Sequence, residues 1–147
     1  MALVRLEGGA GALTAHAADM KAKNKNTYVK GNKGEFSESS GYFIGRFMGE
    51  KGHPELATDE VEVAWKKLPA TFDEESPHFH KGGVEINVVV SGSYKVQIES
   101  EKIALKRGDF LVVYPETRLR NISAEAGTEL IVIKAPSLPN DRFDGDR

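Results

Sequence analysis

Two histidines and one glutamate stand close together in the stretch SPHFHKGGVEINVVVSGSY. His78 and His80 are one residue apart, and residues two apart on a β-strand point to the same side, so both imidazoles would face one ion. After the Gly-Gly turn, the next strand would bring Glu85 back alongside them. Two imidazoles and one carboxylate favour a divalent transition metal such as Fe, Mn, Ni or Zn and leave coordination positions open. The sequence therefore predicts a metal site of His78, His80 and Glu85.

The same residues allow a simpler interpretation, with two exposed histidines on an edge strand and a solvated glutamate at a turn. A His-x-His pair alone is weak evidence for a metal. The full spacing from His78 to Gly92 is more constrained, in a chain that has only 4 histidines. The other two, His16 and His53, have no comparable neighbours, and we expect them on the surface.

The elements that must position these residues are short β-strands. From Ser37 onward, short runs rich in β-branched and aromatic residues are separated by Gly, Pro and Asp, and no long amphipathic helix interrupts them. This spacing is typical of an antiparallel sandwich or barrel, so we predict an all-β domain. The runs are GYFIGRFM, VEVAWKKL, VEINVVV, YKVQIES, KIAL, DFLVVY and ELIVIKA.

Two of these runs predict contact with a second subunit. VEINVVV and LIVIKA are apolar at nearly every position, whereas a strand with one wet face alternates apolar and polar residues. Strands of this kind are covered on both faces, either inside a two-layer fold or at a subunit interface. We therefore expect a homodimer.

The chain is predicted to contain one domain with an extension at each end. Residues 1–35 form an N-terminal extension, in which Leu13, Ala17 and Met20 fall at the spacing of a short helix. Residues 36–136 form the β-domain, because 147 residues suit a single core. Residues 137–147 are highly charged and predicted to be a surface tail.

The amino-acid composition limits the kinds of ligand and partner that we expect for this protein. The 20 basic and 22 acidic side chains leave a formal charge of -2, so no bulk field attracts nucleic acid or an anionic membrane, and a small molecule is the expected ligand. The absence of cysteine excludes disulfides, thiolate metal sites and cysteine nucleophiles. No continuous apolar segment predicts a secretion signal or a membrane span, so a cytoplasmic protein is expected.

The histidine and glutamate spacing resembles the first motif of the cupin superfamily, Gly-x5-His-x-His-x3-4-Glu-x6-Gly. Phe72 stands at the place of its leading glycine. The resemblance implies a double-stranded β-helix, also called a jelly-roll or cupin barrel, with the metal held by His78, His80 and Glu85.

The segment GDFLVVYPETRLRN resembles the second cupin motif, Gly-x5-Pro-x-Gly-x2-His-x3-Asn, in degenerate form. It begins at Gly108, has Tyr114 at the proline place and has Leu119 at the histidine place. In the family this histidine is the fourth protein ligand, and leucine cannot coordinate a metal. Either three ligands and water hold the ion, or the chain keeps the fold without the metal.

Five further residues are candidate ligand-binding groups. Asn87 shares the strand face of Glu85, and Tyr94 belongs to the inward set of the next strand. Three more come from the second motif, near the expected mouth of the barrel, where a guanidinium could bind a carboxylate or phosphate. These three are Tyr114, Arg118 and Arg120.

Three functions fit the sequence. The first is a metal-dependent enzyme acting on a small polar or carboxylate-bearing molecule, of the dioxygenase, isomerase, decarboxylase or lyase type found among cupins. The second is a binding protein for a sugar or organic acid, with or without metal, which Leu119 favours. The third, a purely structural dimerising domain, leaves the paired histidines unexplained.

Overall fold

The computed structural model describes residues 28–70 and 76–145. Gly31–Arg147 forms one compact unit, separate from Met1–Lys30, and contains all the strands described below. The short helix predicted around Leu13, Ala17 and Met20 lies outside the described residues.

Three short 3-10 helices and two strands lead into the main part of this unit. The helices are η1 (Lys33–Ser39), η2 (Arg46–Met48) and η3 (Pro54–Leu56). The strands are β1 (Tyr42–Ile44) and β2 (Glu62–Lys67). No helix in the described ranges is long and apolar enough to cross a membrane.

Eight further strands complete the unit, and every strand pairing is antiparallel. They are β3 (His78–His80), β4 (Val84–Ser91), β5 (Ser93–Ile98), β6 (Glu101–Lys106), β7 (Phe110–Val113), β8 (Leu119–Ala124), β9 (Glu129–Ala135) and β10 (Arg142–Asp144).

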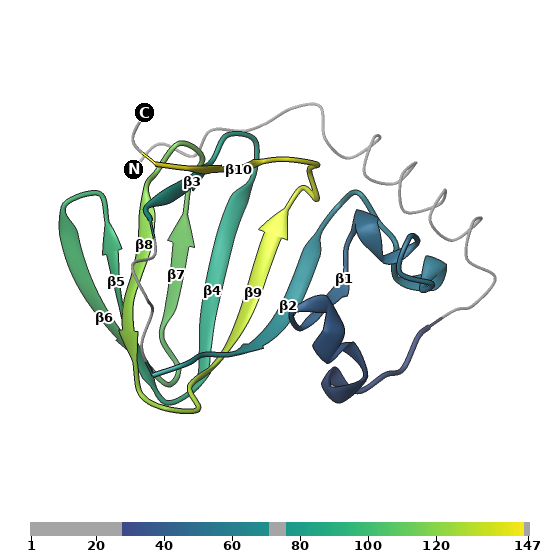
Figure 1. Cartoon of the computed structure of the whole chain (residues 1–147), viewed down its shortest axis with the longest axis horizontal. Helices are drawn as coiled ribbons and strands as arrows, with labels where there is room; N and C mark the ends of the chain where they lie inside the picture. The colour runs from purple at the N-terminus through teal and green to yellow at the C-terminus, as the bar shows by residue number, and fades with distance from the viewer. Residues whose placement is uncertain (1–27, 71–75, 146–147) are drawn as a thin grey trace, which may run out of the picture. The chain divides into compact units, whose positions relative to one another are not determined.

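The strands form two five-stranded sheets (Figure 1). The first sheet has the order β1-β2-β9-β4-β7, and the second has the order β10-β3-β8-β5-β6. Apart from the neighbouring pairs β1–β2 and β5–β6, strands that follow each other in the chain, such as β3 and β4, lie in different sheets. This is the jelly-roll arrangement, and the prediction of an all-β antiparallel fold is confirmed.

The core lies between the inner faces of the two sheets. In β4 the buried residues are Glu85, Asn87 and Val89, and they alternate with half-buried neighbours. In β5, Tyr94 and Val96 are buried in the same alternating way. Strand periodicity thus places two polar residues of β4 on the same inward face as the apolar core. The core cluster is Ala64, Val89, Tyr94, Val96, Leu105, Leu119, Leu130 and Val132.

The tight connection between β4 and β5 depends on glycine. Gly92 has a positive φ of 75°, a conformation that residues with a side chain rarely adopt. A Cβ at this position would also collide with the Oγ1 atom of Thr128. The backbone N–H of Ser93 donates a hydrogen bond to that same oxygen at 3.1 Å. The closing glycine of the first motif therefore serves the turn that returns the chain to the second sheet.

Part of the C-terminal segment predicted to be a surface tail is a strand of the second sheet. β10 pairs with β3 over three residues, and the ring of Phe143 stacks on that of Phe79 with centroids 5.5 Å apart. The charged composition of RFDGDR obscured this single aromatic anchor. The pairing places Arg142 and Asp141 beside the two histidines.

Candidate metal centre and its pocket

His78, His80 and Glu85 converge in the interior of the unit. One ligand atom from each residue lies within 4.8 Å of the others. All three side chains are buried, with 4%, 7% and 6% of their surface exposed. Strand β3 supplies the two imidazoles, and β4, in the other sheet, supplies the carboxylate. The structure therefore brings together the three residues that the sequence predicted as metal ligands.

The turn between β3 and β4 is held by the C-terminal segment. The Oδ1 atom of Asp141 accepts hydrogen bonds from the backbone N–H groups of Lys81, at 3.1 Å, and of Gly82, at 2.9 Å. These bonds join the turn to the segment that enters β10. Asp141 thus helps to set the separation of His80 and Glu85, although it lies about 60 residues further along the chain.

The hydrogen bonds of His80 define how its ring can be protonated. The backbone carbonyl of Asp141 lies 3.0 Å from Nδ1, and because a carbonyl can only accept, Nδ1 carries the hydrogen. Nε2 lies 3.1 Å from Oε2 of Glu85. In the neutral tautomer two acceptors would face each other there. The contact is satisfied by an imidazolium or by a cation bound to both atoms.

Electrostatics keep His78 neutral and Glu85 charged at neutral pH. Burial, aided by the positive charge of Arg142, lowers the pKa of His78 to about 4. Burial alone would raise the pKa of Glu85, but its contact with His80 and the hydrogen bond that Asn87 donates lower it to about 2. A neutral imidazole and a carboxylate are the forms that bind metal ions.

The three side chains fit a divalent transition metal by donor type and spacing. Ligands about 2.1 Å from one ion lie roughly 3 Å apart when adjacent, so small side-chain movements would close a set spanning 4.8 Å. Leu119 begins β8 opposite His78 in the strand register and lines the same cavity. It is 4% exposed and belongs to the hydrophobic core. The position at which the second cupin motif has its metal-binding histidine is thus close to the two imidazoles, but the leucine there cannot bind a metal.

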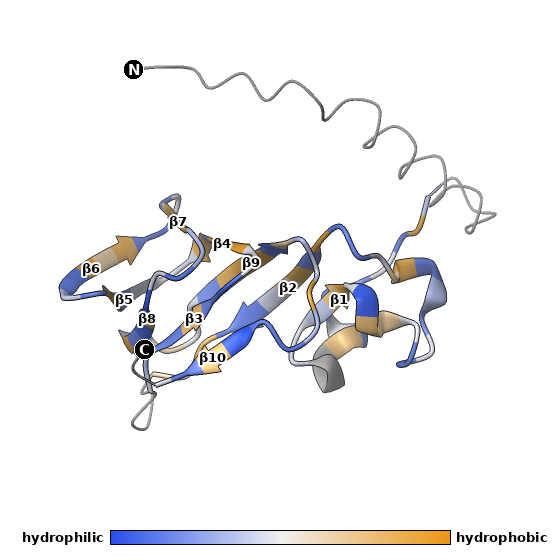
Figure 2. Cartoon of the chain, turned by 90° about the horizontal axis from the view of Figure 1, so that it is seen from above, coloured by the Kyte–Doolittle hydropathy of each residue, from blue (hydrophilic) through white to orange (hydrophobic). Residues whose placement is uncertain are grey.

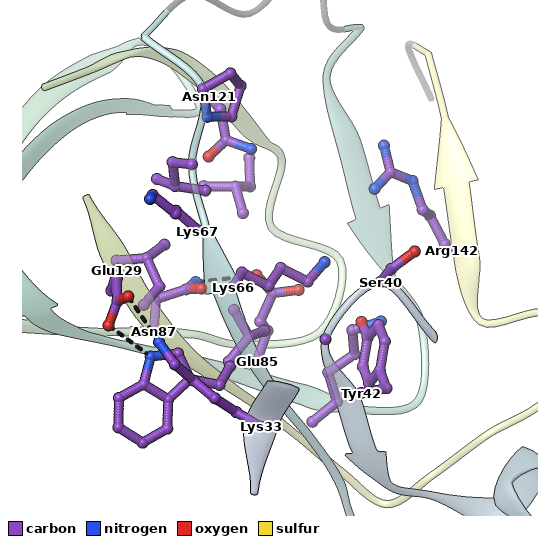
Figure 3. A pocket seen from close by; sticks show the side chains of 18 of the residues that line it. Lys33, Ser40, Tyr42, Lys66, Lys67, Glu85, Asn87, Asn121, Glu129 and Arg142 are labelled. Atoms are coloured by element: carbon purple, nitrogen blue, oxygen red, sulfur yellow. Dashed lines mark hydrogen bonds and ion pairs between the residues drawn. The ribbon is translucent and has the colours of Figure 1, made fainter. Parts of the chain in front are cut away.

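A cavity of about 990 Å³ opens over these residues (Figure 3). Its lining includes His78, His80, Glu85, Asn87 and Leu119. The rest of its wall comes mainly from η1, β1, β2 and β9 within the same unit. Polar and charged side chains dominate this part of the wall, and Figure 3 shows them facing a shared space. Those labelled in Figure 3 are Lys33, Ser40, Tyr42, Lys66, Lys67, Asn121, Glu129 and Arg142. Lys134 lines the same cavity.

Of two further predicted ligand-binding residues, Asn87 lines the cavity beside Glu85, whereas Tyr94 is buried in the core and is not among the cavity residues. The amide of Asn87 donates a hydrogen bond to Oε1 of Glu85 at 2.9 Å, and so orients the carboxylate. Tyr94 is 3% exposed, and its hydroxyl has no hydrogen-bond partner among the described residues. Burial and the negative charge of Glu85 raise the pKa of Tyr94, so its phenol stays protonated.

The three residues predicted from the second motif do not line the main cavity. Tyr114 is 67% exposed. Arg118 donates to Glu99 at 3.0 Å, and Arg120 donates to Gln97 at 2.8 Å. Both arginines border a separate cavity of about 310 Å³. Their partners on and after β5 draw them away from the histidines, so we leave all three out of the proposed site.

Several cavity residues were not singled out from the sequence. Lys134 was part of the apolar run LIVIKA, and Arg142 was assigned to the tail. Trp65 donates a hydrogen bond to Glu129 at 2.9 Å, and Lys33 forms an ion pair with the same carboxylate at 2.7 Å. Lys134, a lysine within an otherwise apolar strand, was the one local sign in the sequence that this strand faces a polar group, which is Glu85.

Comparison with known proteins agrees with this fold. Residues 65–134 match the family model described as Cupin domain. No curated protein matches the sequence.

Three solved structures illustrate the likeness. The Streptomyces protein PAC13, described as a nucleoside dehydratase and solved with uridine, is 19% identical over 61% of this chain and 72% of its own, with a TM-score of 0.54. A Klebsiella pneumoniae protein with a double-stranded β-helix domain is 18% identical over 61% and 78%, with a TM-score of 0.51. The DMSP lyase DddQ from Ruegeria pomeroyi is 17% identical over 59% and 44%, with a TM-score of 0.52. Identities this low establish a shared fold alone.

Proposed function

We propose that this chain, a small cupin-domain protein, binds one divalent transition metal ion and acts as a metal-dependent enzyme on a small polar molecule. His78, His80 and Glu85 would hold the ion, and the cavity of about 990 Å³ above them would hold the substrate. When bound, such an ion acts as a Lewis acid on an oxygen of the substrate. Leu119 leaves the coordination positions beyond the three side chains to water or substrate.

The contact between His80 and Glu85 carries this proposal. Because Nδ1 of His80 donates to Asp141, Nε2 presents a lone pair to a carboxylate 3.1 Å away unless the ring is charged. A second imidazole with a pKa of about 4 stands within the same cluster. Burying such a group without a cation would be costly, since each polar atom would lose its water.

The surrounding residues have positioning roles in this proposal. Asn87 fixes one oxygen of Glu85 through the 2.9 Å hydrogen bond, which leaves the other oxygen directed at His80. Asp141 fixes the His80 tautomer through its carbonyl and the β3–β4 turn through its carboxylate. Removal of a residue that holds a metal ligand in place commonly lowers metal affinity by roughly 10- to 100-fold.

The function is tested by metal analysis followed by turnover. Protein purified without chelators or a histidine tag should contain, or take up, close to one equivalent of Fe, Mn, Ni or Zn. Metal-loaded protein should then convert one or more members of a panel of small polar and carboxylate-bearing compounds, followed by oxygen uptake and product analysis. A metal content near zero after loading with all four ions would refute the proposal.

The alternative is a binding protein for a sugar or an organic acid. Leu119 favours this alternative, because it removes one metal-binding side chain, as expected for a site that no longer catalyses a reaction. The turnover experiment distinguishes the two functions. Its control is a variant that carries both His78→Ala and His80→Ala. Equal ligand affinity in both proteins, and turnover in neither, would favour the binding function.

We further propose that the outer face of the first sheet contacts a second copy of the chain. The residues that alternate with the core in β2, β9, β4 and β7 are half-buried or exposed, and apart from the charged pair Lys67 and Glu129 they form two uncharged rows across the sheet. Figure 2 shows hydrophobic segments, in orange, along β4 and β9. In a two-fold dimer the same patch of each subunit forms the interface, and an exposed apolar sheet face is suited to such a contact. The cross-strand rows are Val63, Ile133, Ile86 and Val112, and Ile131, Val88 and Phe110.

Phe110→Asp should convert such a dimer to a monomer. Phe110 is 69% exposed within the unit, so a carboxylate costs little in the isolated chain but would be desolvated in the interface. Light scattering after size-exclusion chromatography should give twice the chain mass for the wild type and the chain mass for the variant. Ala104→Asp, on an exposed position of β6 in the other sheet, is the matched control. A monomeric wild type would refute the dimer.

A further inference from the structure

Positive side chains outnumber carboxylates around the cavity of the proposed metal centre. Its lining contains Lys33, Lys66, Lys67, Lys134 and Arg142, but only two carboxylates, those of Glu85 and Glu129. Glu129 is already neutralised by Lys33 at 2.7 Å. Glu85 belongs to the three proposed ligands, and a divalent ion there would add further positive charge. The field inside the cavity therefore favours an anionic ligand.

Lys134 links this positive charge to the metal centre. It lies opposite Glu85 in the pairing of β9 with β4, and its Nζ is 3.5 Å from Oε2 of Glu62. Burial lowers the pKa of Lys134, but Tyr42 and the carboxylates of Glu62 and Glu85 outweigh burial and raise it. This lysine is thus charged and already has a carboxylate partner.

Among the described residues, Lys66 and Lys67 are the two cations of this cavity that form no ion pair with a carboxylate, and Lys66 is the one of the two that approaches Tyr42. Nζ of Lys66 lies 5.0 Å from the centre of the Tyr42 ring, and Nζ of Lys134 lies 5.5 Å from the same centre. Two ammonium groups therefore approach one aromatic ring. Within the described ranges, no carboxylate forms an ion pair with Lys66, which is half-buried and faces the space over Glu85 (Figure 3). An anion bound beside Tyr42 would relieve the repulsion between the two lysines.

We propose that the ligand of this cavity is a small organic dianion. One anionic group reaches the metal centre, and the second, a carboxylate or a phosphate, binds Lys66 beside Tyr42. Ser40 and Asn121 line the same cavity and offer hydrogen bonds to the uncharged part of such a molecule. The inference rests on the proposed metal centre, and it adds a second recognition point at a different strand, β2.

The experiment is a calorimetric titration of zinc-loaded protein with matched probes. Succinate and glutarate carry two carboxylates, butyrate carries one at similar size, and phosphoglycolate carries a phosphate and a carboxylate. At low salt, at least one of these three probes with two anionic groups should bind about tenfold or more tightly than butyrate, because only such a molecule reaches both points. Because phosphoglycolate carries the greater charge at neutral pH, it would assign a phosphate to Lys66 only if it binds more tightly than both dicarboxylates and also loses more affinity than they do in Lys66→Gln. A larger loss for the dicarboxylates would assign a carboxylate.

Lys66→Gln should remove this advantage, lowering dianion affinity about tenfold while leaving butyrate affinity unchanged. Lys66→Arg, which keeps the charge, should retain most of it. Lys95→Gln, at an exposed lysine of β5 away from the cavity, is the matched control and should bind as the wild type does. All variants should show the circular dichroism spectrum of the wild type.

Metal content measured on the same samples separates the two proposals. Protein that takes up no zinc or other ion contradicts the proposed function, whatever the probes do. Metal-loaded protein that binds every dianion no better than butyrate overturns the inference about the ligand and leaves the metal centre standing. A dianion preference that persists unchanged in Lys66→Gln overturns the role of Lys66.

Discussion

Replacing His80 with alanine should lower the metal affinity of this protein by at least about 100-fold. His80 is one of only three metal-ligating side chains in the cluster, and Leu119 occupies the place where a fourth would stand. Its removal would leave one imidazole and one carboxylate, too few to compete with water for a divalent ion. It would also free Glu85 from the partner 3.1 Å away. Isothermal titration with zinc, together with elemental analysis, measures the change.

His53→Ala is the matched control for this substitution. His53 is also a histidine of the described chain, but its side chain is 41% exposed and faces Glu55 at 3.6 Å, away from the cluster. This variant should bind one equivalent of zinc with wild-type affinity. Thermal unfolding supplies a second measurement, since an ion at 100 times its Kd stabilises the native state by about 2.7 kcal/mol. Wild-type zinc affinity in His80→Ala would contradict the proposed metal centre.

Leu119→His should have the opposite effect and strengthen metal binding by about tenfold or more, which corresponds to roughly 1.4 kcal/mol. Leu119 pairs with His78 in the strand register and lines the cavity beside all three proposed ligands. An imidazole there would supply a ring nitrogen as the fourth protein ligand of the same ion. Zinc titrations of the wild type and the variant compare the two affinities.

The same substitution should destabilise the metal-free protein. Leu119 is 4% exposed within the core cluster, so loss of its packing and burial of a polar ring should lower the free energy of unfolding by about 2–4 kcal/mol. Leu119→Ala separates the two effects, because it loses the same packing without adding a ligand. Equal zinc affinities for Leu119→His and Leu119→Ala would show that this position does not face the ion.

The cluster of His78, His80 and Glu85 could be predicted because its geometry is local. Alternation along β3 places the imidazoles on one side, and a short Gly-Gly turn returns the chain at once to Glu85. The same alternation along β4 placed Asn87 beside Glu85, where it forms a hydrogen bond at 2.9 Å. Each of these relations spans fewer than ten residues.

The surroundings of the side chains in the second motif could not be predicted, because their partners could not be seen in the sequence. Arg118 and Arg120 follow the expected strand, but their hydrogen bonds to Glu99 and Gln97 turn them to a separate, smaller cavity. The C-terminal segment was misjudged for a related reason. Its charge suggested a solvated tail, whereas the stacking of Phe143 on Phe79 and the pairing of β10 with β3 place it in the sheet.

The sequence by itself determined the antiparallel β-fold and the three donors of the candidate metal centre, since both follow from the two-residue period of strands and from turns of a few residues. Only the tertiary structure decided what surrounds those donors. Lys66, Lys134 and Arg142 belong to β2, β9 and β10 and line one cavity. Pairing places β2 beside β9 in the first sheet, whereas β10 pairs with β3 in the second sheet. Contacts between these strands depend on register and topology, which no local pattern of residues specifies.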